Sequence, residues 1–357
     1  MKRTVAFFMA VNLLMWTVSG CGYDAVPAIE TTAQEKETRA TRDENKAEVK
    51  ADAESGRDDK ERVTDNTGET VSGAENTIDS DAFTEAKVSF LGPAGTYTEE
   101  ATRFFFGEKG TFLPKDTVSE AISDVVTGDS EYAVIPQENT LGGAVTGYVD
   151  ALIAEENVYV VGEVVLPINQ TLMGVEGATV EDIKTVCSHA QGIKQTEKWR
   201  AEHMPDAEVS EMASTAAAAS YVAEQGDKTI AAIASPGAAE LYGLTVLAEN
   251  VQITDANKTR FYVLSKAPLE SEGNDRALFV ADCEANRIDD IILTIHDAGL
   301  ELVTIHDRPE GSKLGRYNYI IETEKTGGVT KEDIDEVSGQ EGVRFLGSFG
   351  AVEVPVV

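Results

Sequence analysis

The sequence is poor in cysteine and histidine. Its 357 residues contain three cysteines (Cys21, Cys187 and Cys283) and four histidines. Three cysteines without a CxxC pair are too few for a disulfide framework, and we expect Cys187 and Cys283 to be buried, unreactive thiols. The histidines form neither an HExxH motif nor a cluster with cysteines, so we predict no metal site.

Positive charge is also scarce. Lysine and arginine total 30 residues against 63 aspartates and glutamates, which gives a formal net charge of −33. A surface of this sign is unsuited to nucleic acid, which requires a cationic partner. The length predicts two or three domains, and the hydrophobic content of 42% is enough for a sizeable core.

The first 21 residues have the pattern of an export signal. Lys2 and Arg3 precede an apolar run over residues 5–18 that is short for a membrane span. The run ends in Val-Ser-Gly-Cys, which resembles the lipobox of bacterial lipoproteins. We therefore expect residues 1–21 to be a signal peptide and Cys21 to be lipidated, which anchors the protein on the outer face of the cytoplasmic membrane or in the periplasm. The alternatives are an uncleaved signal anchor or a buried apolar segment; if the signal is not used, the protein stays in the cytoplasm.

Residues 22–85 have a different composition. Charged and small polar residues dominate, and Phe83 is the single aromatic residue after Tyr23. Such a segment buries too little apolar surface to offset the entropy of ordering it. We interpret it as a disordered, acidic tether, so that the lipid is the only membrane contact.

From residue 86 the sequence alternates between strand and helix patterns. Strands are predicted at residues 87–91, 131–136, 184–187, 229–234 and 257–264. Helices are predicted to begin after Thr96, near Gly143, near Ala190, at Ser214 or Thr215, and after Ser235. This order predicts an α/β fold with a largely parallel sheet. Ligands of such sheets bind beyond the carboxyl ends of the strands, where helix N-termini supply N–H donors and partial positive charge.

The C-terminal part has another order of elements. Strand patterns cover residues 276–283, 301–306, 317–323 and 343–349, and helix patterns cover residues 288–298 and 330–337. The resulting order, βαββαβ, is typical of the α+β ferredoxin-like fold.

Five short segments follow one another in this region. They are FLGPAGTYTEEA from Phe90, IPQENTLGGAV from Ile135, SHAQGIKQ from Ser188, STAAAA from Ser214 and NKTRF from Asn257. Together they resemble the prephenate dehydratase family, which implies a two-lobed catalytic domain, like a type II periplasmic binding protein, over residues 86–266. The segment LVTIHDRPEG partly matches the family's ACT regulatory domain, which is expected over residues 275–357.

The resemblance implies a lyase that removes carbon dioxide and the ring hydroxyl from prephenate to give phenylpyruvate in phenylalanine biosynthesis, without a cofactor. In the family, the Thr of the Thr-Arg-Phe motif donates a hydrogen bond to the hydroxyl that leaves. This residue is Thr259 here, and it must act by position in a dry pocket. Arg260 either pairs with a substrate carboxylate or forms a structural ion pair. Phe261 is expected to pack as core rather than touch the ring. Because prephenate is a dianion, helix N-termini must make the pocket locally positive.

The other candidate substrate-binding residues come from the remaining motifs: Thr96, Thr98, Glu138, Asn139, Thr140, His189, Gln191, Ser214 and Thr215. Thr96 and Thr98 are placed for helix capping, which is compatible with carboxylate binding. Thr140 replaces the family's usual Ser and keeps its hydroxyl, and Glu138 is expected to orient its neighbours.

Two substitutions occur in the segment that normally reads His-Pro-Gln-Ala. Ala190 replaces the proline and Gly192 replaces the alanine. We therefore expect a more flexible loop at this site.

The candidate effector site departs further from the family. Its residues are Arg276, Ala277, Leu278, His306, Asp307, Arg308 and Pro309. Arg276 replaces a glycine that lets the backbone approach the ligand, and His306-Asp307 replaces Glu-Ser. We expect the effector L-phenylalanine to bind weakly or not at all, whereas a homodimer or tetramer through the ACT sheets is still expected.

Three functions compete at this point. The first is the prephenate dehydratase itself. The second is an exported aromatic-acid binding protein derived from the enzyme, which would suit the anchor because prephenate is made inside cells. The third is a structural dimer with an idle cleft. The complete Thr-Arg-Phe motif favours the enzyme, since a binding protein has no need of that donor.

Overall fold

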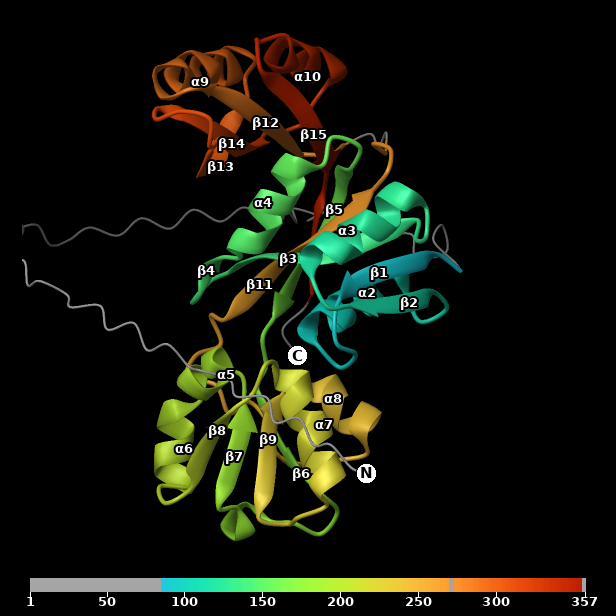
Figure 1. Cartoon of the computed structure of the whole chain (residues 1–357), viewed down its shortest axis with the longest axis vertical. Helices are drawn as coiled ribbons and strands as arrows, with labels where there is room; N and C mark the ends of the chain where they lie inside the picture. Colours follow the sequence, from blue (N-terminus) through green and yellow to red (C-terminus); the bar gives the residue numbers. More distant parts are fainter. Residues whose placement is uncertain (1–84, 270–272, 355–357) are drawn as a thin grey trace, which may run out of the picture. The chain divides into compact units, whose positions relative to one another are not determined.

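The computed structural model describes residues 85–269 and 273–354 (Figure 1). The predicted signal peptide, Cys21 and the predicted tether lie outside the described residues. In the part of the chain that the structure describes, no helix combines the length and the apolar content that crossing a bilayer requires.

The first lobe, lobe one, is assembled from two separate stretches of chain. The first stretch contains β1 (Lys87–Leu91), α2 (Tyr97–Phe106), β2 (Thr111–Lys115), α3 (Val118–Thr127), β3 (Tyr132–Asn139), β4 (Gly143–Ala144), α4 (Thr146–Ala154) and β5 (Tyr159–Pro167). The second stretch returns later in the sequence as β11 (Lys258–Ser265). β11 inserts between β3 and β5, which gives the strand order β2-β1-β3-β11-β5.

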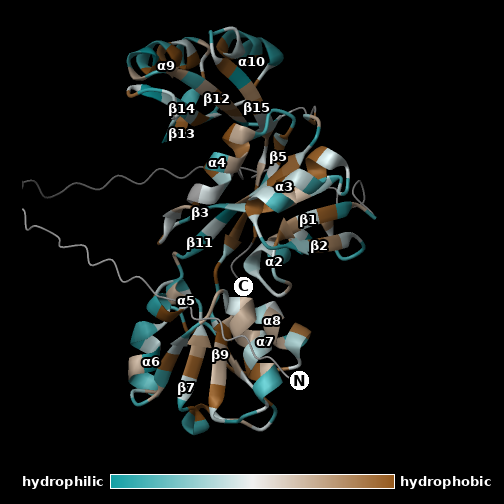
Figure 2. Ribbon diagram, in the orientation of Figure 1, coloured by the Kyte–Doolittle hydropathy of each residue, from teal (hydrophilic) through white to brown (hydrophobic). Residues whose placement is uncertain are grey.

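Lobe two is one continuous stretch between these two parts. It contains β6 (Thr171–Gly174), the 3-10 turn η3 (Val180–Asp182), β7 (Thr185–Ser188), α5 (Ala190–Gln195), α6 (Glu197–His203), β8 (Glu208–Glu211), α7 (Thr215–Gln225), β9 (Ile230–Ala234), α8 (Pro236–Tyr242) and β10 (Thr245–Ala248). Its strand order, β8-β7-β9-β6-β10, repeats that of lobe one. Figure 2 shows hydrophobic residues along β9 and hydrophilic ones on α6, as expected when helices cover a buried sheet.

The predicted largely parallel sheet is wrong in one respect. In each lobe, the strand that arrives from the other lobe runs antiparallel to its neighbours: β11 to β3 and β5, and β6 to β9 and β10. The chain crosses between the lobes at residues 168–170 and 249–257. A strand that enters in this way has no crossover helix, so it need not run parallel.

Local capping chemistry explains where several helices begin. Thr96, Thr117 and Ser214 each accept a hydrogen bond from the backbone N–H three residues later, at the starts of α2, α3 and α7. The helix predicted near Gly143 begins later, at Thr146, because residues 143–144 pair with β3 as β4.

The C-terminal domain has the predicted βαββαβ order. Its elements are β12 (Arg276–Glu284), the 3-10 turn η4 (Ala285–Arg287), α9 (Ile288–Asp297), β13 (Glu301–Pro309), β14 (Arg316–Glu324), α10 (Lys331–Ser338) and β15 (Val343–Phe349). The strand order is β13-β14-β12-β15, which is ferredoxin-like. α9 and α10 cover one face of this sheet (Figure 1).

The opposite face of the C-terminal sheet packs on lobe one. One core cluster joins lobe-one residues to the C-terminal domain; it includes Tyr148, Leu152, Tyr262, Leu278, Ile320 and Phe349. The two sheets also meet edge to edge, because Gly347 of β15 pairs with Val160 of β5. A Cβ at Gly347 would lie 2.0 Å from the carbonyl oxygen of Val160. The last strand, β16 (Ala351–Glu353), then pairs with β5 in parallel.

Candidate active site

A cavity of about 520 Å³ is lined by residues from both lobes. Nine of the candidate site residues named from the sequence line it: Thr96, Thr98, Asn139, His189, Gln191, Ser214, Thr215, Thr259 and Phe261. The structure thus brings together five segments that are up to 165 residues apart in the sequence. This cavity is the candidate active site.

Thr259 reaches the cavity through the alternation of side chains along β11. Thr259 pairs with Asn139 of β3 on one side and with Leu166 of β5 on the other. Because successive side chains of a strand point to opposite faces, Thr259 and Phe261 face the cavity, while Arg260 and Tyr262 face the other side. Both cavity residues are nearly inaccessible to solvent, with exposed fractions of 8% and 1%.

The hydroxyl of Thr259 has a defined role as an acceptor. Nδ2 of Asn139 donates to Oγ1 of Thr259 at 2.9 Å. Oδ1 of Asn139 accepts from the backbone N–H groups of Leu141 (3.1 Å) and Gly142 (2.9 Å) and from Nε2 of Gln191 (2.9 Å). These three donors fix the orientation of the amide, because only its oxygen can accept them. Thr259 therefore keeps its own hydrogen available for a ligand in the cavity.

The hydrogen bond between Gln191 and Asn139 also explains why residue 142 is a glycine. A Cβ added at Gly142 would lie 2.8 Å from Nε2 of Gln191. A side chain at this position would displace the amide of Gln191, which comes from lobe two. The glycine therefore permits a hydrogen bond between the lobes at the edge of the cavity.

Helix N-termini contribute the positive potential of the site. Thr96 and Thr98 lie at the start of α2, and Ser214 and Thr215 lie at the start of α7. Among the described residues that line the cavity there is no lysine or arginine, and Asp116 is the single carboxylate. An anionic ligand must therefore be held by hydroxyls, amides and the N–H groups of helix ends, which favour negative charge.

The substituted His-Ala-Gln-Gly segment forms the start of α5. Nδ1 of His189 accepts the backbone N–H of Gln191 at 3.3 Å and thereby caps this helix. A Cβ at Gly192 would lie 2.5 Å from Oγ of Ser188, which is buried and donates to the carbonyl of Ile233. With an alanine at position 192, the Ser188 hydroxyl would have to shift from the position it has here.

The structure adds lining residues that the sequence analysis missed. Gln170, in the first crossing segment, is 2% exposed and donates from Nε2 to Oε1 of Gln195 at 3.0 Å. Its Oε1 has no partner among the described residues. Tyr97 also lines the cavity, and its hydroxyl donates to the carbonyl of Asn169. The sequence offered no signal for Gln170, because its burial becomes visible only in the structure.

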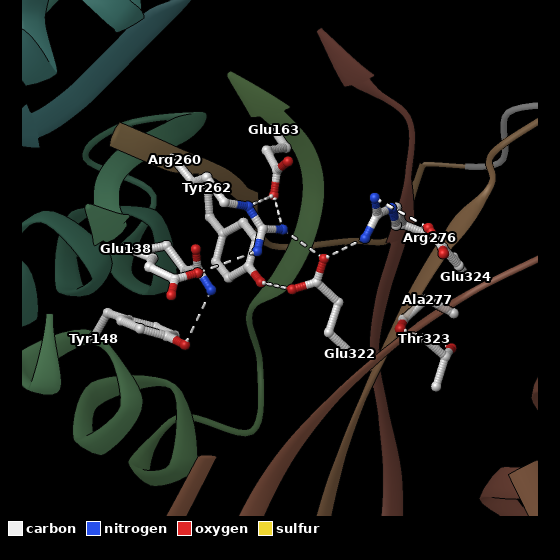
Figure 3. Close-up of polar contacts among 11 residues, drawn as sticks. Glu138, Tyr148, Glu163, Arg260, Tyr262, Arg276, Ala277, Glu322, Thr323 and Glu324 are labelled. Atoms are coloured by element: carbon white, nitrogen blue, oxygen red, sulfur yellow. Dashed lines mark hydrogen bonds and ion pairs between the residues drawn. The ribbon is translucent and has the colours of Figure 1, made fainter. Parts of the chain in front are cut away.

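Three candidate residues do not line the cavity. Thr140 uses its hydroxyl in the backbone, donating to the carbonyl of Ala256 and accepting the N–H of Lys258. Glu138 and Arg260 lie on the opposite face of the sheet, where Nη1 of Arg260 and Oε2 of Glu138 are 3.6 Å apart. Of the two alternatives for Arg260, the structure has the ion pair (Figure 3).

A second cavity, of about 680 Å³, lies between α2 and α8. Four glutamates line it, Glu99, Glu100, Glu108 and Glu240, together with Arg103. Its negative charge makes it unsuitable for a dicarboxylate. No group of three or more potential metal ligands occurs in the residues that the structure describes.

Comparison with known proteins identifies the family. A sequence model of the prephenate dehydratase family matches residues 88–269, just over half of the chain. The chain belongs to the prephenate dehydratase family. Prephenate dehydratase is a lyase, and the matched residues include every residue that lines the candidate active site.

Relatives of the prephenate dehydratase family match most of the chain. A bifunctional chorismate mutase/prephenate dehydratase from Aquifex aeolicus is 32% identical over 240 residues, which are 67% of this chain and 65% of that protein. The chain thus spans about two-thirds of that bifunctional relative. The crystal structure of prephenate dehydratase in complex with L-Phe from Arthrobacter aurescens superimposes with a TM-score of 0.68 and 30% identity, covering 76% of this chain and 92% of that one. The protein GqqA, described as a novel type of quorum quenching acylase, gives a TM-score of 0.66 and 28% identity, covering 74% and 98%.

Proposed function

We propose that the protein converts prephenate to phenylpyruvate. The carboxylate on the ring carbon leaves as carbon dioxide, its bonding electrons move through the ring, and the ring hydroxyl leaves as water after accepting a proton. The observation that carries this proposal is the contact between Asn139 and Thr259, in which the Thr259 oxygen accepts, so that its hydrogen remains available to a ligand; Thr259 is only 8% exposed. A positioned donor at the leaving hydroxyl is the one group that this elimination requires.

The rest of the cavity suits the two carboxylates of prephenate. The starts of α2 and α7 offer hydroxyls and the N–H groups of a first helical turn, and Phe261 offers an apolar surface for the ring. Because the product ring is aromatic, the reaction has a large driving force, and holding the substrate in one pose supplies much of the catalysis.

Two other functions make different demands on the same cavity. An acylase requires a nucleophile that is activated by a base. Among the described residues no hydroxyl hydrogen-bonds to His189, whose Nδ1 accepts a backbone N–H instead. An exported binding protein for aromatic acids would need the carboxylate-binding helix ends but not the Thr259 donor.

The decisive experiment is incubation of the purified protein with prephenate while phenylpyruvate is recorded. Turnover that disappears in Thr259→Val supports the dehydratase. Tight binding of prephenate without product would support the binding protein, and hydrolysis of an N-acyl substrate without dehydration would support an acylase.

We also propose that residues 86–266 form the catalytic domain and that residues 275–357 form an ACT-like regulatory domain, which joins chains as a dimer or tetramer. Its ferredoxin-like strand order supports this proposal. L-Phe is bound by the Arthrobacter relative, and it is the candidate effector here.

The location of the protein is a separate proposal. The charge pattern of residues 1–21 and the lipobox-like sequence before Cys21 support export as a lipoprotein. Cys21→Ser is expected to release the protein from the membrane fraction, because a lipid is the anchor expected. An unmodified Met1 in membrane-bound wild-type protein, detected by mass spectrometry, would contradict this proposal.

A further inference from the structure

A charged network lies behind the catalytic strand, on the face of β11 away from the cavity. Nε of Arg260 donates to Oε2 of Glu163 at 3.0 Å, and its Nη2 contacts both Glu163 and Glu322. The hydroxyl of Tyr262 donates to the second oxygen of Glu322 at 3.0 Å. Figure 3 shows these side chains converging from lobe one and from the C-terminal domain.

Glu322 is the member of this network that comes from the C-terminal domain. It lies on β14 and is completely buried, with an exposed fraction of 0%. Arg276 of β12 donates to Oε1 of Glu322 at 3.1 Å from the other side. Glu322 thus receives two guanidinium groups and one phenol, which satisfies a carboxylate that burial would otherwise destabilise.

The two faces of β11 are connected by the strand itself. Arg260 and Tyr262 alternate with Thr259 and Phe261, which line the cavity. A displacement of the backbone at Arg260 would therefore also displace Thr259, its neighbour in the strand. Small displacements of a reacting group have large effects on rate, because catalysis by a positioned donor depends on its geometry.

We infer that Glu322 is a positioning residue for the reaction, through which the C-terminal domain holds the catalytic strand. This inference rests on the proposed function. Glu322 fixes Arg260 and Tyr262 behind β11, and Arg276 supplies the second positive charge that Glu322 requires. The C-terminal domain is thus part of the catalytic apparatus, although it contributes no residue to the cavity lining.

Glu322→Gln tests the inference in the full chain. It keeps the shape of the side chain and removes its charge. We expect kcat to fall roughly 10-fold or more, the scale of a small misplacement, with KM changed by less than about 3-fold because no cavity contact is lost. Glu324→Gln is the matched control, because Glu324 lies two residues further along β14, is half-exposed and pairs with Arg276 at 3.1 Å. Equal kcat values for the two variants, or a change in KM alone, would overturn the inference.

A double variant tests whether Glu322 acts through Arg260. Arg260→Gln alone removes a positive charge from two buried carboxylates, Glu163 and Glu322. Adding Glu322→Gln to it removes one of these charges, so the double variant should be at least as active as Arg260→Gln alone. If the losses of kcat in the two single variants multiply in the double variant, Glu322 and Arg260 act independently, which would contradict the inference. If Glu322→Gln does not fold, Tyr262→Phe removes a single hydrogen bond of the network, and an unchanged kcat in that variant would overturn the inference.

Hydrogen exchange separates this inference from the proposed function. If the wild-type protein does not convert prephenate, the proposed reaction is wrong. The effect of Glu322 on the stability of β11 can still be measured. The amides of β11 should exchange faster in Glu322→Gln than in Glu324→Gln, while those of β7 in lobe two remain unchanged. Equal exchange of β11 in the two variants would show that Glu322 does not hold this strand.

Discussion

Asn139 and Thr259 lie opposite each other on β3 and β11, and the Asn139 amide donates to the Thr259 hydroxyl across 2.9 Å. The pairing of two neighbouring strands thus sets the direction of a hydroxyl. A threonine is a weak acid in water, so the fixed position of this hydroxyl and its 8% exposed fraction are what the site contributes.

Thr259→Val is expected to lower turnover roughly 10²-fold or more, the scale of a lost positioned donor. The fold should be retained, because valine has nearly the same shape as threonine. Phenylpyruvate formation measures the effect. Thr127→Val, which removes an exposed hydroxyl at the end of α3, is the control and should keep wild-type turnover. Near-normal turnover in folded Thr259→Val would show that the donor is another group.

Asn139→Asp is expected to reverse the hydrogen bond to Thr259. An ionised aspartate cannot donate, so the threonine hydroxyl would donate to it and lose its role toward the substrate. We expect a loss of kcat on the order of 10²-fold. The double variant Asn139→Asp/Thr259→Val should be no slower than the slower single variant, because both changes remove one function. Losses that multiply would mean that Asn139 has a separate role.

Glu100 makes stability depend on pH. Burial raises the pKa of its carboxyl from 4.5 to about 7. The folded state therefore binds this proton more tightly than the unfolded state, and the free energy of unfolding should fall as pH rises from 4.5 to about 7. The loss is up to about 3 kcal/mol.

Glu100→Gln should remove this pH dependence and be more stable than wild type at pH values above 7. Denaturant unfolding at several pH values measures it. Glu202→Gln, at an exposed position of α6, controls for the loss of one negative charge. If the free energy of unfolding changes with pH in the same way in wild type and in Glu100→Gln, the prediction is wrong.

Phenylalanine is expected to bind weakly. Arg276 stands where the family has a glycine and is held in place by Glu322 and Glu324, each at 3.1 Å. Arg308 pairs with Asp150 of α4 at 2.7 Å, and the ring of His306 meets that of Tyr148 edge-on. A ligand would have to displace these contacts, and each loss of about 1.4 kcal/mol lowers affinity 10-fold. Calorimetry is the test; low micromolar binding together with inhibition of turnover would show the prediction to be wrong.

Local chemistry made much of the fold predictable. The caps at Thr96 and Ser214 and the proline at residue 236 marked helix starts that the structure contains. The βαββαβ order of the C-terminal domain was predicted from periodicity, since its elements are contiguous in sequence. The direction of β11 was not predictable in this way, because it depends on where the chain re-enters lobe one.

The site was predictable only in part for a similar reason. Motifs marked Thr259, Arg260 and Phe261, but they did not indicate which face of β11 each side chain occupies. The partners of Arg260, Glu163 and Glu322, lie in segments without a motif, and Glu322 is 62 residues away in another domain. Such long-range pairs are decided by tertiary packing, which no local pattern records.

Strand β16 has a consequence for the order in which the protein matures. Lobe two needs only its own continuous stretch of chain to fold, whereas lobe one also needs β11 and then residues 351–353, which come much later in the sequence. Until those residues arrive, β5 presents an unpaired edge, which is a template for association with other chains. A premature stop that spares both the catalytic motifs and the C-terminal helices would still leave an aggregation-prone nascent protein.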